Sequence, residues 1–120
     1  GVHGGSLKGE NHALDLLRGR KLHSLVLALL MPLDRSHRSH TAAPLEHITD
    51  LFRRARSEFP DTPLLLGCAR PFGKLQQQLD RTAVDLGFDG IAFPAEGIVS
   101  YAREQGLTPK FSEYCCALML

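Results

Sequence analysis

Short apolar runs that alternate with longer amphipathic segments constrain the fold of this chain more than any other feature. Three such runs lie at residues 24–31, 64–66 and 88–94, and proline or glycine closes each of them. A short, uninterrupted apolar run is typical of a parallel strand that is covered on both faces. Apolar residues recur with helical spacing in the segments at about 10–18, 41–59, 75–86 and 95–105.

The order of these segments predicts an α/β fold with a parallel sheet. With a further strand end at residues 1–3, the chain runs strand then helix through four βα units. Alternation of this kind specifies right-handed crossovers, and four βα units are half of a TIM-like barrel. We therefore expect one half-barrel domain over residues 1–120, as a fragment of a larger barrel.

A half barrel has two unpaired strand edges and an exposed apolar inner face, which are liabilities in isolation. We therefore expect it to pair with an N-terminal half barrel, a partner subunit or a second copy in a homodimer. The 14 basic and 13 acidic residues give a net charge of +1, which argues against a dedicated nucleic-acid surface. The longest apolar run, residues 25–31, is too short to span a membrane. Three cysteines without an even framework indicate a reducing, cytoplasmic compartment.

The carboxyl ends of parallel strands are where α/β folds bind ligands. Five residues are expected at those ends and are the candidates for binding a small-molecule substrate: His3, Met31, Cys68, Arg70 and Phe93. Arg70 is the most specific of them, since a guanidinium binds a carboxylate through two parallel hydrogen bonds. Its alternative is a solvated rim charge. If it binds a ligand, Arg70→Ala should impair binding with little loss of folding.

The other polar candidates keep two interpretations each. Cys68 is a ligand contact or a small apolar packing residue. Adjacent cysteines rarely bond to each other, so Cys115 and Cys116 belong to a redox-active or cluster-proximal tail, or to an inert one. His37 and His40 have a spacing used in metal sites, but an active-site loop is the favoured interpretation, and no metal ligand is assigned there.

Two further segments, a glycine-rich turn and a basic cluster, also allow a structural and a functional interpretation. The glycine-rich turn at residues 4–10 is a tight turn or a cradle for a phosphate or an adenosine. The basic cluster of Arg53, Arg54 and Arg56 is interpreted as a solvated helix face, because no aromatic platform for nucleic acid accompanies it.

Several short motifs occur together and in order: His3-Gly4-Gly5, Gly9-Glu10-Asn11-His12-Ala13-Leu14, Met31-Pro32, Phe59-Pro60-Asp61-Thr62-Pro63, Gly67-Cys68-Ala69-Arg70-Pro71, Gly87-Phe88-Asp89-Gly90-Ile91-Ala92-Phe93-Pro94 and Phe111-Ser112-Glu113-Tyr114-Cys115-Cys116. With them the chain resembles the C-terminal half of biotin-synthase-like radical S-adenosylmethionine proteins. The most similar branch includes a subunit of the two-part, archaeal-type lipoyl synthase.

The resemblance implies a partial barrel with S-adenosylmethionine and a four-iron four-sulfur cluster, in an enzyme of cofactor biosynthesis such as sulfur insertion. Reductive cleavage of the cofactor would yield a carbon radical that abstracts hydrogen from the substrate. The glycine segment is similar to the family's fifth-strand motif, which implies cofactor contacts at Gly4, Gly5 and Glu10, although Leu7 and Lys8 depart from that motif.

The family's cluster-binding loop, Cys-x-x-x-Cys-x-x-Cys, does not occur in this sequence. The cluster ligands are therefore expected outside this chain, and the chain is not expected to be catalytic alone. The alternative is a non-catalytic half-barrel subunit or partner-binding module.

Overall fold

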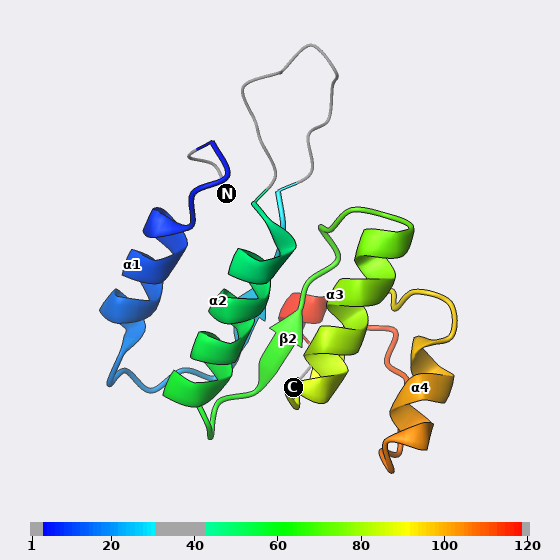
Figure 1. Cartoon of the computed structure of the whole chain (residues 1–120). Helices are drawn as coiled ribbons and strands as arrows, with labels where there is room; N and C mark the ends of the chain where they lie inside the picture. The colour runs from blue at the N-terminus through cyan, green and yellow to red at the C-terminus, as the bar shows by residue number, and fades with distance from the viewer. Residues whose placement is uncertain (1–3, 31–42, 119–120) are drawn as a thin grey trace.

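The computed structural model describes residues 4–30 and 43–118 and arranges them as helices alternating with parallel strands (Figure 1). The elements in order are α1 (Lys8–Leu17), β1 (Leu25–Leu27), α2 (Leu45–Glu58), β2 (Leu64–Leu66), α3 (Lys74–Asp85), β3 (Gly90–Ile91), α4 (Ile98–Glu104) and the 3-10 helix η1 (Cys116–Leu118). The α/β prediction with a parallel sheet is confirmed. The strand expected at residues 1–3 lies outside the described residues.

The described strands form one parallel sheet in the order β1-β2-β3. All three residues of β2 are buried, as their unbroken apolar run predicts for the central strand. β3 is shorter than its apolar run, because Phe93 has a φ of 48° and so leaves the extended conformation. Proline at position 94 also lacks the N–H that a longer ladder requires.

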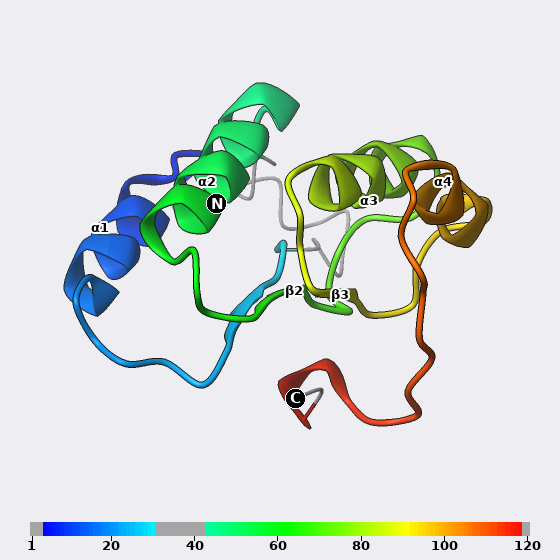
Figure 2. The ribbon, with the colours of Figure 1, turned by 90° about the horizontal axis from the view of Figure 1, so that it is seen from below.

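All four helices lie on one side of the sheet, and the segment that follows α4 crosses the other side (Figure 2). Leu64 packs with Leu14 and Phe59 beneath α1 and α2. Leu66 packs with Phe52 and Leu79 beneath α2 and α3. Same-side helices are what right-handed crossovers produce when the strands follow each other in sequence order.

Arg54 fastens α1 to α2. Its guanidinium donates hydrogen bonds to Glu58 on its own helix (2.9 Å) and to the Asn11 side chain on α1 (2.7 Å), and it also pairs with Asp15. The hydrogen bond from Arg54 is the largest cause that lowers the pKa of Glu58 below its usual value, and Arg18 adds to it. The Arg54 side chain is half-buried and is bound to acidic partners on both helices, so the interpretation of Arg54 as part of a solvated face is wrong.

Arg56 is likewise not a solvated charge. Its guanidinium donates to the carbonyl oxygens of Phe59, Pro60 (2.8 Å) and Thr62 (2.9 Å), where α2 ends and the chain turns into β2. It also pairs with Asp89 (3.1 Å), whose carboxylate accepts the Leu64 N–H. The carbonyls at the end of a helix need donors, and an arginine there supplies several. Arg53 alone fits the prediction of an exposed charge.

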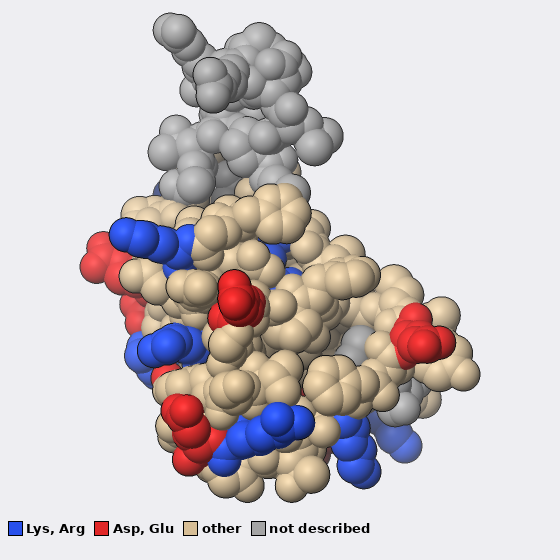
Figure 3. Space-filling view, turned by 90° about the vertical axis from the view of Figure 1, so that its right-hand side faces the viewer, with Lys and Arg blue, Asp and Glu red and all other residues tan. Residues whose placement is uncertain are grey.

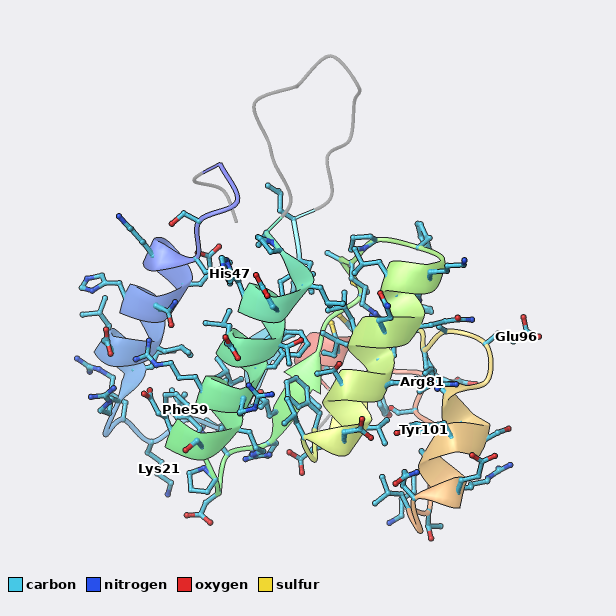
Figure 4. The ribbon with its side chains drawn as sticks, viewed as in Figure 1. Lys21, His47, Phe59, Arg81, Glu96 and Tyr101 are labelled. Carbon is cyan, nitrogen blue, oxygen red and sulfur yellow. The ribbon has the colours of Figure 1, made fainter. Side chains whose placement is uncertain are left out.

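α4 is attached to α3 through Tyr101, which points toward Arg81 (Figure 4). The Tyr101 hydroxyl donates to Asp85 (2.6 Å), and the Arg81 guanidinium lies 4.9 Å from the centre of the ring. The hydrogen bond to Asp85 is the largest cause that raises the pKa of Tyr101 above its usual value. Within the described ranges, no helix has the length and apolarity needed to cross a membrane.

Candidate functional site

The inner face is the side of the sheet opposite helices α1 to α4, and its described residues pack closely. Val26, Leu65 and Gly90 lie in register across the three strands. Because side chains alternate along a strand and Leu64 and Leu66 face the helices, this row faces the other way. One step toward the carboxyl ends, a Cβ on Gly67 would lie 3.2 Å from Val26 Cγ1 and 3.3 Å from Ala28 Cβ. These close approaches leave little room for a Cβ at Gly67, and Leu65 on the same face is buried.

Apolar cavities follow both free edges of this sheet. The cavity beside β1 measures ≈ 290 Å³ and is walled mainly by apolar side chains of α1, β1 and α2. The cavity beside β3 measures ≈ 1040 Å³ and runs from residues 87–89 to the carboxyl end at Phe93 and Pro94. Residues 107–116 form its opposite wall. Among the described residues, each cavity therefore lies beside one outer strand of the sheet.

Arg70 lies inside the protein and not on the rim, so its role as an anion-binding side chain is corrected. It is 2% exposed and donates to both oxygens of Asp80 from Nε (2.8 Å) and Nη2 (3.2 Å). Two more bonds reach the carbonyl oxygens of Gly67 (2.6 Å) and Phe93 (2.9 Å). The Arg70 guanidinium thus makes four hydrogen bonds within the protein, and a guanidinium has five N–H donors. The expected two-pronged carboxylate contact exists, but Asp80 of the same chain makes it.

Asp80 is the functional residue that sequence reasoning missed. It is completely buried, and besides Arg70 it accepts the backbone N–H of Ala95 (2.7 Å). The signal was present, because Asp80 lies beside Leu79 and one helical turn from Ala83 on the buried side of α3. An acidic residue on the apolar face of a helix requires a partner, and Arg70 is that partner.

Phe93 reaches the cavity as predicted for a residue at a strand end, with an unusual backbone. Its φ of 48° makes it the one non-glycine residue with a positive φ in the part of the chain that the structure describes. Its carbonyl accepts hydrogen bonds from Arg70 and from Gln76 (3.1 Å). Its ring is 81% exposed and lines the cavity beside β3.

The chain's three cysteines line that same cavity. Cys68 enters from the end of β2, and Cys115 and Cys116 enter from the tail. All are free thiols, with Cys68 and Cys115 exposed and Cys116 half-buried. The described residues nevertheless contain no group of three or more histidine, cysteine or acidic side chains placed to hold a metal ion. The residues present therefore do not fit an iron–sulfur cluster.

The glycine turn lies just before α1. Gly4 and Gly5 both have positive φ values, of 60° and 82°, and a Cβ on Gly4 would meet nothing within 4 Å. Glu10, in the first turn of α1, borders the cavity beside β1. An open, left-handed turn fits a ligand that approaches backbone groups closely. The structure does not bring this segment and Phe93 into one cavity, since Glu10 lines the cavity beside β1, Phe93 lines the cavity beside β3, and Gly4 and Gly5 line neither.

Four sequence-predicted residues lie outside the described ranges: His3, Met31, His37 and His40. On the described face that carries α3 and α4, positive and negative side chains are interspersed (Figure 3). The wall of the cavity beside β3 is more apolar than charged, and its few charged residues include Lys110 and Glu113 on the tail.

A scan against protein-family models, a search of curated proteins and a search of solved structures find no match to this chain.

Proposed function

We propose that this chain forms one wall of the substrate chamber of a radical S-adenosylmethionine enzyme of cofactor biosynthesis, with a biotin-synthase-like half-barrel architecture. The arrangement of layers carries the proposal. Doubly wound α/β folds place helices on both faces of the sheet, whereas a barrel places them only outside. Here helices α1 to α4 cover one face of the described sheet, the segment after α4 crosses the other face, and the larger cavity lies between that segment and β3.

The chemistry divides between this chain and a complementary half, from the same polypeptide or from another one. The complementary half would carry the cluster, because the cluster motif is not in this sequence. This chain would contribute binding surface: Glu10, which follows the glycine turn, at one edge, and Cys68 with Phe93 at the other. Arg70 would act through Phe93 and not by touching the substrate.

The alternative proposal is a non-catalytic half-barrel subunit that binds a partner. The observation behind it is that β1 and β3 are the outer strands of the described sheet. In that case the free edges of β1 and β3 would serve only for assembly. Strand edges with unpaired N–H and C=O groups readily add further strands.

Formation of 5′-deoxyadenosine separates the two proposals. The chain would be produced together with its complementary half, loaded with iron and sulfide without oxygen, and reduced in the presence of S-adenosylmethionine. We expect 5′-deoxyadenosine and methionine from the assembly and none from this chain alone. An assembly that lacks the three-cysteine loop, or that forms no 5′-deoxyadenosine, would refute the enzyme proposal and leave the partner-binding one.

A further inference from the structure

We infer that Phe93 is the contact residue for a flat aromatic moiety of a ligand, and that Arg70, Asp80 and Gln76 are the positioning residues that hold it there. This inference rests on the proposed function, since it names a chemical class for the ligand of the same chamber. The observation behind it is an exposed ring on a backbone conformation that several hydrogen bonds fix.

The first step is the backbone. A positive φ is unfavourable for a residue with a Cβ, and it persists only where surrounding contacts determine it. Here Arg70 and Gln76 both donate to the Phe93 carbonyl, while Asp80 accepts the Ala95 N–H two residues later. The loop is thus fixed at the Phe93 carbonyl and at the Ala95 N–H, by residues of α3 and by Arg70 after the end of β2.

The second step is the ring. This conformation does not bury the Phe93 side chain, which remains 81% exposed on the cavity wall. Burial of the ring would have stabilised the fold, so burial of the ring is not what selects this backbone conformation. Phe111 and Tyr114 line the same cavity from the tail and are also largely exposed.

The third step is the chemical class. Aromatic rings prefer offset-stacked or edge-to-face partners, and such pairs contribute beyond the area that they bury. A cavity that presents three largely exposed aromatic side chains, with few charges, therefore favours a flat, conjugated, largely apolar moiety over a compact ion. Phe72 provides the matched control, because it is equally exposed at 81% on the neighbouring loop but does not line this cavity.

The test uses the full chain and the uncharged fluorescent probe N-phenyl-1-naphthylamine, with folding checked by circular dichroism. We expect Phe93→Ala to raise the probe's Kd about 10-fold and Phe93→Leu to raise it about 3-fold. Phe72→Ala should leave it unchanged. Gln76→Met keeps the side-chain length but removes one donor to the Phe93 carbonyl, and should weaken binding about 2-fold to 3-fold without loss of folding.

The positioning role is read separately, from the ¹⁹F resonance of 4-fluorophenylalanine at position 93 in the ligand-free chain. Gln76→Met should shift that resonance, whereas Gln77→Met, one residue further along the exposed side of α3, should not. Failure of the parent chain to bind the probe, a Phe93→Ala effect below 2-fold, or equal weakening by Phe72→Ala would overturn the inference. If the probe results hold while the assembly forms no 5′-deoxyadenosine, the aromatic site stands and the proposed enzyme function falls.

Discussion

Arg70→Ala should destabilise the protein severely, which reverses the expectation from sequence that it would spare folding. The substitution leaves the Asp80 carboxylate completely buried with one remaining backbone donor, the Ala95 N–H. Removing one partner of a buried ion pair costs about 3–5 kcal/mol. A chain of 120 residues has a free energy of unfolding of roughly 6–18 kcal/mol. The variant should therefore lose between about a sixth and about five sixths of its stability.

Urea unfolding followed by circular dichroism at pH 7 measures this loss, and a double-mutant cycle assigns it to the pair. Arg70→Met with Asp80→Leu removes both charges, so its destabilisation should fall below the sum of the single variants by about 2 kcal/mol or more. Arg53→Ala is the control, since Arg53 pairs with Asp50 at the surface and should contribute under about 1 kcal/mol. An Arg70→Ala loss no larger than that of Arg53→Ala would refute the reasoning.

Three further predictions follow from other contacts. Arg54 lowers the pKa of Glu58 below 4.5, so the stability that Glu58 contributes is complete above pH 4.5 and is lost as the pH falls through the lower pKa of the folded state. The difference in melting temperature between the parent and Glu58→Gln should therefore disappear in acid. A difference that stays constant with pH would contradict this prediction. Phe93→Gly should be more stable than Phe93→Ala by about 1 kcal/mol in thermal unfolding, because glycine relieves the positive φ; the reverse order would show that the loop carries no strain. Sedimentation velocity should show self-association of the chain at micromolar concentration, since β1 and β3 are the outer strands of the described sheet, whereas a compact, stable monomer would count against the half barrel.

The α/β class follows from the sequence because its signals are strong and local. The unbroken run of β2 and the helical spacing in α2 and α3 each depend on burial of a single element. Strand ends are less predictable, because they depend on dihedral angles. Nothing in the letters at position 93 indicates that the backbone there leaves the extended region after only two paired residues of β3.

The candidate site keeps its binding roles as predictions, and what the structure adds is the surroundings of its residues. Placement at strand ends brought Cys68 and Phe93 to one cavity correctly. Arg70 was assigned to a ligand because sequence distance hides Asp80, which lies ten residues later and on a helix. Whether an arginine at a strand end meets a ligand or an internal carboxylate depends on two things: which side of the neighbouring helix carries the carboxylate, and how deeply the arginine is buried. Both are known only from the folded chain.

Two arginine networks at opposite ends of β2 explain why one end suits a site and the other does not. At the amino end, Arg56 binds carbonyls of the turn and pairs with the half-exposed carboxylate of Asp89. It therefore only stabilises the turn between α2 and β2. At the carboxyl end, Arg70 and Asp80 are both buried, and what they fix is the Phe93 carbonyl beneath an exposed ring. Barrel folds keep stability at the amino ends of their strands and ligand contacts at the carboxyl ends. The Arg70 network joins these two tasks, because the same buried pair that stabilises the fold also determines where the aromatic side chain stands.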